Sequence, residues 1–129
     1  MARIETYRDL LAWQRGVDLA VDIYALTRTF PKSEIFGLSS QVQRSAVSVA
    51  ANVAEGYGRS GPGEYLRFLS NARGSLRETE THLIIADRVG FSKHSTHLAL
   101  LDSADEVGRL LYGLTRSVSR SSARGLPGR

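Results

Sequence analysis

The chain of 129 residues has no cysteine, three prolines and a single tryptophan. Without cysteine it cannot form a disulfide, a thiolate nucleophile or a cysteine-ligated zinc site. No segment reaches the run of about 18 apolar residues that spans a bilayer. The N-terminal segment MARIETYRDL is charged and lacks the apolar core of a signal peptide. We therefore expect a cytoplasmic protein, and the length predicts one domain.

Acidic residues are missing from the C-terminal segment. Residues 1–106 contain 12 basic and 13 acidic side chains, whereas residues 107–129 contain five arginines and no acid. Of the 17 basic residues, 15 are arginine, whose planar guanidinium suits phosphate and carboxylate groups. The segment indicates attraction to nucleic acid or to an acidic partner, and a merely solubilising tail remains an alternative.

Apolar residues recur at helical spacing in four segments, and no alternation with a period of two is sustained. The first segment has two adjacent apolar seams, made of Leu10, Trp13, Val17, Ala20 and Tyr24 and of Ala12, Gly16, Leu19, Ile23 and Leu26. A single seam suffices for a helix that lies on one core. Two seams predict a helix that is covered on two sides, by its own bundle and by another subunit.

The three later segments each have one seam. We expect helices from a cap at Ser39 or Ser40 to about Glu55, from Pro62 after a cap at Gly61 to Gly90, and from a cap at Ser92 or Ser95 to about Ser119. The seams are Val42, Ala46, Val49 and Val53; Tyr65, Leu69, Ala72, Leu76, Thr79, Leu83 and Ala86; and His97, Leu100, Ala104, Val107, Leu111, Leu114 and Val118. This pattern predicts an antiparallel up-down four-helix bundle over residues 1–119, followed by a flexible basic tail over 120–129.

Polar residues form a stripe on each of the two middle helices. The members are Gln41, Arg44, Ser48, Asn52 and Glu55 on the second helix, and Asn71, Ser75, Glu78 and His82, with Arg73 and Arg77 beside them, on the third. If these helices are antiparallel neighbours, the stripes meet in a hydrogen-bonded network that fixes the register of the bundle. A solvated face and a ligand site are the alternatives.

Catalytic and metal-binding patterns are weak. A di-metal bundle needs Glu-x-x-His on two helices and two further glutamates, whereas the chain offers only Glu78 with His82, and Glu55 as an addition. The stretch EGYGRSGPGE lacks the lysine of a phosphate loop and follows no strand. We therefore predict a protein without enzymatic activity, metal or cofactor. A metal-dependent enzyme using these three residues is the least favoured alternative.

Four glycines fall inside the predicted helices, at positions 16, 74, 108 and 113. Each costs about 1 kcal/mol relative to alanine in a helix interior. We expect close helix–helix approach to be the reason for them.

The motifs DLLAWQ, FPKSEIFGL, SQVQRSAVSVAANVAEG and FLSNARGSLRE occur here in one order and spacing. With them the chain resembles the small bacterial four-helix-bundle proteins encoded in intervening sequences of large-subunit ribosomal RNA genes. The accessory variability determinant proteins of diversity-generating retroelements belong to the same broad group. The resemblance is close over about residues 7–90 and looser over the fourth helix. It implies a ring-like homo-pentamer without catalytic activity, and in the retroelement members nucleic-acid binding and partnership with a reverse transcriptase.

Composition and resemblance together predict a homo-oligomeric bundle that binds RNA or DNA phosphates with little sequence preference, as an accessory to a reverse transcriptase. The candidate contacts are Arg59, Arg109, Arg116, Arg120 and Arg124. Arg109, Arg116 and Arg120 are spaced by seven and four residues, which places them near one face of the fourth helix. The alternative function is a scaffold that docks an acidic protein partner and has no role with nucleic acid.

Overall fold

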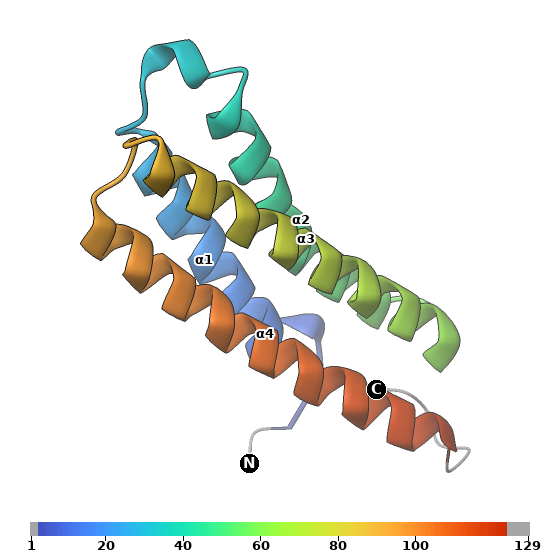
Figure 1. Ribbon diagram of the computed structural model, residues 1–129. Coiled ribbons are helices and arrows are strands. Elements are labelled where there is room, and N and C mark those ends of the chain that lie inside the picture. The colour runs from blue at the N-terminus through green and yellow to red at the C-terminus, as the bar shows by residue number, and fades with distance from the viewer. Residues whose placement is uncertain (1–2, 124–129) are drawn as a thin grey trace.

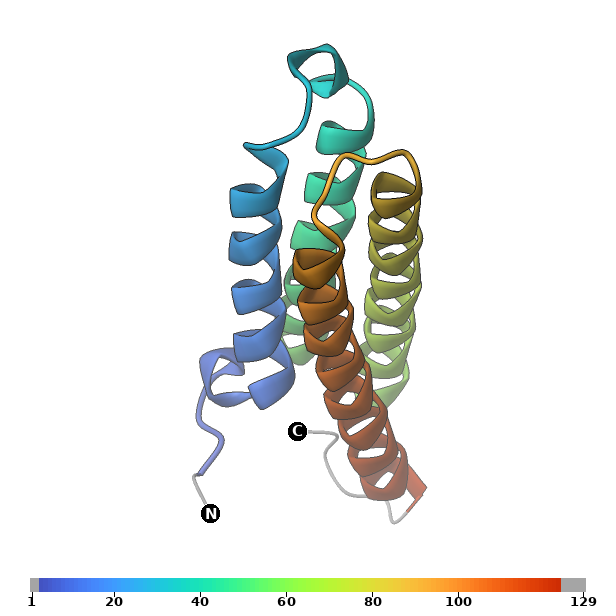
Figure 2. The same ribbon diagram turned by 60° about the vertical axis from the view of Figure 1, so that its left-hand side comes forward.

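The computed structural model describes residues 3–123, and these form an all-α bundle of four helices (Figure 1). The helices are α1 (Leu11–Thr27), α2 (Leu38–Tyr57), α3 (Pro62–Arg88) and α4 (His94–Ala123). Two short 3₁₀ turns, η1 (Tyr7–Asp9) and η2 (Lys32–Glu34), precede α1 and α2. Each long helix packs against two neighbours, in the cyclic order α1, α2, α3, α4 (Figure 2). The predicted four-helix bundle is confirmed.

The apolar seams predicted for the last three helices form the core. Every predicted seam residue of α2 and α3 is buried, as are those of α4 except the half-buried Leu114. On α1, one seam is buried within the bundle: Ala12, Gly16, Leu19, Ile23 and Leu26. The other seam is covered only in part, since Trp13, Val17 and Ala20 are half-buried and Tyr24 is exposed. The chain therefore leaves one apolar side of α1 open.

Glycine shapes both ends of α3. Gly61 is the N-cap with φ 84°, and Pro62 and Glu64 follow in the first turn, as predicted. At the other end Gly90 has φ 83°. Its N–H donates to the Asp87 carbonyl (3.1 Å), and the Phe91 N–H donates to the Ala86 carbonyl (2.8 Å). This is a Schellman motif, which satisfies the last carbonyl groups of the helix and starts the turn into α4.

The predicted serine caps are wrong. Helix α2 begins at Leu38, so Ser39 and Ser40 lie inside its first turn. Its first N–H is instead satisfied by Glu34, whose Oε1 accepts from Leu38 N at 3.1 Å. Helix α4 begins at His94, between the two candidate serines. At the start of α2, the Glu34 carboxylate from the preceding turn thus takes the place of the expected serine hydroxyl. The usual capping patterns place the capping residue next to the helix and do not predict this contact.

The predicted end of the fourth helix is also wrong. Helix α4 continues to Ala123, so Arg120 is helical rather than part of a flexible tail. Val118 is buried near this end, and such packing extends a helix beyond what its exposed serines and arginines favour. The rest of the predicted tail, from Arg124, lies outside the described residues.

Close helix approach explains one of the four mid-helix glycines well. A Cβ added at Gly16 would lie 3.3 Å from the Ala50 Cβ of α2. At Gly108 it would make an ordinary contact, 3.4 Å from a Leu76 methyl group, and at Gly74 and Gly113 it would meet nothing within 4 Å. The tightest approach involves Gly56 near the end of α2, where an added Cβ would lie only 2.8 Å from the Phe68 Cβ.

These contacts predict opposite effects of two glycine-to-alanine substitutions. Gly56→Ala places a methyl group against the backbone-proximal part of Phe68 and should destabilise the fold by about 1–3 kcal/mol. Gly74→Ala adds a methyl group in open space and should stabilise it by up to about 1 kcal/mol through helix propensity. Urea denaturation followed by circular dichroism measures both. Equal effects would contradict the packing of α2 on α3.

Candidate nucleic-acid interface

Polar side chains join α2 to α3 along one seam. Ser75 Oγ donates to Ser48 Oγ at 2.9 Å, directly across the two helices. Asn52 Nδ2 lies 2.9 Å from the same Ser48 oxygen and 2.8 Å from the Ser48 carbonyl. These three residues belong to the stripes predicted from the sequence, and the structure brings them together.

The most buried part of this seam is a pair that the sequence did not identify. Thr79 Oγ1, fully buried on α3, donates to Ser45 Oγ of α2 at 2.9 Å. Ser45 in turn donates to the Val42 carbonyl at 3.2 Å, and His82 Nδ1 lies 3.4 Å from its Oγ. Thr79 Oγ1 also lies 2.9 Å from the Ser75 carbonyl, so each hydroxyl has an acceptor in its own helix as well. The cross-helix hydrogen bond favours one register of α3 on α2 by about 0.5–1.5 kcal/mol. We call Ser45, Ser48, Asn52, Ser75, Thr79 and His82 the hydroxyl seam.

The other predicted members of the network lie outside the hydroxyl seam. Gln41, Arg44, Glu55, Asn71, Arg73 and Glu78 are all exposed. Successive residues of an α-helix are rotated by about 100° around the helix axis. The Arg44 position is therefore rotated about 40° from that of Ser48 toward solvent, and the Asn71 and Glu78 positions are rotated about 40–60° from that of Ser75. Those angles place their side chains on the solvent side of the contact. Glu55 pairs instead with an arginine of the following turn.

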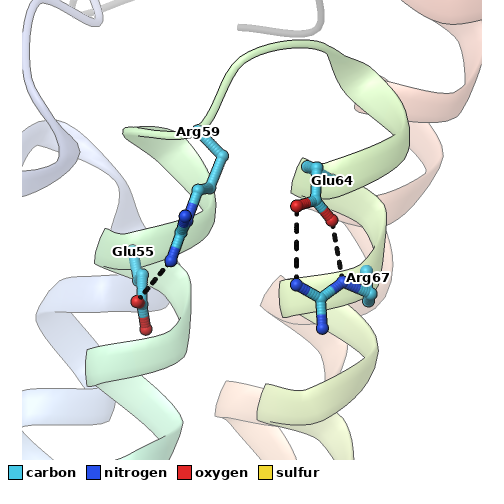
Figure 3. A network of polar contacts seen from close by, with 4 residues as sticks. All are labelled: Glu55, Arg59, Glu64 and Arg67. Carbon is cyan, nitrogen blue, oxygen red and sulfur yellow. Dashed lines mark hydrogen bonds and ion pairs between the residues drawn. The ribbon is translucent and has the colours of Figure 1, made fainter.

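That arginine, Arg59, is held within the α2–α3 hairpin (Figure 3). Its Nη2 lies 2.9 Å from Glu55 Oε1, and its guanidinium lies 5.0 Å from the centre of the Phe68 ring. Among the candidate arginines, Arg59 therefore has a clear structural task.

A second pair belongs to the same hairpin. Arg67 Nε donates to Glu64 Oε2 at 2.7 Å, and the Arg67 guanidinium lies 4.7 Å from the Phe68 ring (Figure 3). This hydrogen bond lowers the pKa of the Glu64 carboxyl and raises the pKa of Arg67. Each arginine of the hairpin thus has a carboxylate of its own, and this turn offers little free positive charge.

Arginines from two helices meet on the opposite side of α3. Arg73 and Arg77 of α3 face α4 across a surface hollow of about 430 Å³, lined also by Asp105, Gly108, Arg109 and Tyr112. We call this the arginine hollow. Arg109 pairs with Asp105, and Arg77 Nη1 lies 2.7 Å from Glu80 Oε1. Arg73 is exposed beside them.

The arginine stripe of α4 continues beyond the hollow. The Arg116 guanidinium lies 5.7 Å from the centre of the Tyr112 ring, and Arg120 is exposed one turn further along. Arg124, the last candidate, lies outside residues 3–123. The spacing of Arg109, Arg116 and Arg120 thus places them along one line, as expected for a single helical face.

Sequence reasoning missed the α3 side of this surface. It placed Arg73 and Arg77 beside the polar stripe of the third helix, and it did not assign Tyr112 of α4 to any site. The available signal was the i,i+4 spacing of Arg73 and Arg77, which places both on one face of α3. That spacing shows which residues share a face, but only the packing of α3 against α4 shows that this face borders Arg109.

An apolar groove lies on the far side of the bundle, between α1 and α2. It measures about 450 Å³ and is lined by Val17, Ala20, Val21, Tyr24, Arg28, Val47, Ala50 and Ala51. Val21 is 61% exposed, and Tyr24 and Val47 are each 45% exposed. This apolar groove contains Val17, Ala20 and Tyr24 of the open seam of α1.

Two further classes of site can be checked against the geometry. Among residues 3–123, no group of three or more histidine, aspartate or glutamate side chains is arranged to hold a metal ion. Over the same residues, no helix is both long and apolar enough to cross a membrane.

The comparisons with known proteins agree with this fold. The model of the 23S rRNA-intervening sequence protein family matches residues 8–113, and the chain belongs to that family. It is also similar to the crystal structure of a protein of unknown function from the S23 ribosomal protein family of Bacteroides thetaiotaomicron. That similarity has a TM-score of 0.73 and 21% sequence identity, over 81% of this chain and 98% of that one. No functionally curated protein matches the sequence.

Proposed function

We propose that this protein is a non-enzymatic, homo-oligomeric bundle that binds the phosphates of RNA or DNA through the α3–α4 surface. The observation that carries the proposal is the convergence of Arg73, Arg77 and Arg109 on one hollow. Arg116 and Arg120 extend the same surface along α4. Five arginines over two adjacent helices match the spread of charge that a nucleic-acid backbone presents.

The charge balance of this surface favours an anionic ligand. Asp105 and Glu80 each pair with one arginine and hold it in place. Even with these two acids counted, the five arginines leave an excess of positive charge. Guanidinium groups bind phosphate oxygens through charge-assisted hydrogen bonds, which carry no base sequence information. We therefore propose binding with low sequence specificity.

The apolar groove supports the oligomeric part of the proposal. Exposed Val21 and Val47 face solvent beside three alanines, of which Ala50 is buried, Ala20 half-buried and Ala51 exposed, an arrangement suited to a subunit contact. The groove lies between α1 and α2, whereas the arginine hollow lies between α3 and α4. Assembly through the groove would leave the arginines accessible. A ring of five copies, and a role beside a reverse transcriptase, are proposed from the family resemblance.

The second candidate function is docking of an acidic protein partner. It is favoured by the carboxylate pairs already present, because Arg77 and Arg109 each bind a carboxylate within the chain. A partner rich in aspartate and glutamate would use the same surface. The experiment below distinguishes the two.

The double substitution Arg73→Gln and Arg109→Gln should weaken binding of labelled RNA and duplex DNA about tenfold or more near 50 mM salt. It should also reduce the slope of the logarithm of the binding constant against the logarithm of the salt concentration by about one to two, because two phosphate contacts are removed. Fluorescence anisotropy titrations at several salt concentrations measure both quantities. The control is Arg8→Gln with Lys32→Gln, which removes the same charge from η1 and η2.

If the Arg73→Gln, Arg109→Gln protein and the Arg8→Gln, Lys32→Gln control lose affinity equally, only net charge matters. That result would overturn the assignment of binding to the α3–α4 surface. Absence of binding by the unaltered protein near 50 mM salt would overturn the nucleic-acid function. In that case, binding of an acidic polypeptide such as polyglutamate, lost in the double mutant, would establish the second candidate.

Charge placed in the apolar groove should dissociate the oligomer. Val21→Glu buries a carboxylate in any contact formed there, so the mutant should sediment as a 14.1 kDa monomer while the unaltered protein sediments as a larger species. Leu98→Glu is the matched control, since Leu98 is a 49% exposed aliphatic residue of α4 outside the groove. A monomeric unaltered protein, or an unchanged mass for Val21→Glu, would contradict the proposed contact.

A further inference from the structure

The arginine hollow contains an exposed aromatic ring. Tyr112 is 57% exposed on α4, one turn from both Arg109 and Arg116. Tyrosine is a large, partly apolar side chain, and burial of its ring would be favourable. Here the ring instead lines a hollow whose other side chains are charged.

Its neighbours leave the ring open on one side. Arg116 approaches the ring at 5.7 Å from its centre. Gly108 precedes Tyr112 by four residues, the position whose side chain would otherwise lie beside the ring. An added Cβ at Gly108 would make only an ordinary contact with Leu76, so helix packing does not require glycine there. The missing side chain keeps the hollow accessible next to the ring.

We propose that Tyr112 is a stacking platform for an unpaired base, and that the arginine hollow binds single-stranded nucleic acid in preference to duplex. This inference rests on the proposed function and narrows it. A base with a free π-face stacks on tyrosine, Arg116 adds a planar cation beside it, and the arginines of the hollow bind the flanking phosphates. In a duplex both faces of each base are already stacked, so a ring on a helix surface reaches only the backbone.

The charges favour this occupant over a second copy of the chain. A two-fold contact of hollow against hollow would bring Arg73, Arg109 and Arg116 against the same residues of the other subunit. Like charges so opposed are unfavourable. A polyanion with planar bases satisfies the arginines and the ring together.

The test compares base-bearing and abasic strands. An unstructured strand of about 12 nucleotides falls within the site sizes of single-strand binders. It is prepared as RNA, as DNA, as an abasic DNA of equal length and as a duplex, and each is titrated by fluorescence anisotropy. Tyr112→Leu removes the aromatic face, and Tyr112→Phe keeps it.

We expect Tyr112→Leu to weaken binding of the base-bearing single strands about 5- to 100-fold, the range for loss of one stacked base. Tyr112→Phe should stay within about twofold of the unaltered protein, because stacking uses the ring and not the hydroxyl. Neither change should affect the abasic strand or the duplex. The RNA and DNA arms show whether the sugar contributes.

Equal binding of base-bearing strands by the unaltered protein and Tyr112→Leu would overturn the stacking role. If the Arg73→Gln, Arg109→Gln protein still loses affinity in that case, the proposed function survives without it. If no strand binds the unaltered protein, the proposed nucleic-acid function and the stacking role of Tyr112 are both overturned. A change in sedimentation mass on Tyr112→Leu would also overturn the inference, since Tyr112 would then be a subunit contact.

Discussion

The buried hydrogen bond between Thr79 and Ser45 fixes how α3 lies on α2, and the position of the arginines depends on it. Helix α3 turns its hydroxyl groups toward α2, its apolar residues toward the core, and Arg73 and Arg77 toward α4. A rotation of α3 equivalent to one residue, about 100°, would move all three faces at once. It would break the hydrogen bond between Thr79 and Ser45 and carry Arg73 and Arg77 away from Arg109. The hydroxyl seam thus orients α3 on α2, and that orientation sets where Arg73 and Arg77 lie on the opposite side of α3.

The two open surfaces lie on opposite sides of the bundle. Because the helices follow one another in a cycle, the α1–α2 pair and the α3–α4 pair face away from each other. If copies assemble through the apolar groove, each contributes one arginine surface to the outside of the assembly. Several weak phosphate sites on one particle bind a long polyanion far more tightly than one site does, provided the strand can reach them together. Modest affinity at each hollow is therefore compatible with tight binding by an oligomer.

Much of the fold could be predicted because its causes are local. The seven-residue spacing of Leu69, Leu76 and Leu83, which is about two helical turns, identifies a buried face, and Gly61–Pro62 marks where α3 begins. The cap of α2 was mispredicted because Glu34 acts from a separate turn. Thr79 was taken for a seam residue and Ser45 was overlooked, because their pairing depends on the register between two helices. For the same reason Arg73 and Arg77 could not be grouped with Arg109: each pattern identifies a face of one helix, and a site between helices needs both.

Photo-crosslinking tests the central claim, that nucleic acid lies against the α3–α4 surface, most directly. A single strand carrying 4-thiouridine would be irradiated with the unaltered protein, and the crosslinked peptides would be mapped by mass spectrometry. The account predicts adducts concentrated at residues 105–116 of α4 and in the adjacent segment 73–77 of α3. Adducts confined to the α1–α2 groove or to the hairpin around Arg59, with none between α3 and α4, would contradict it.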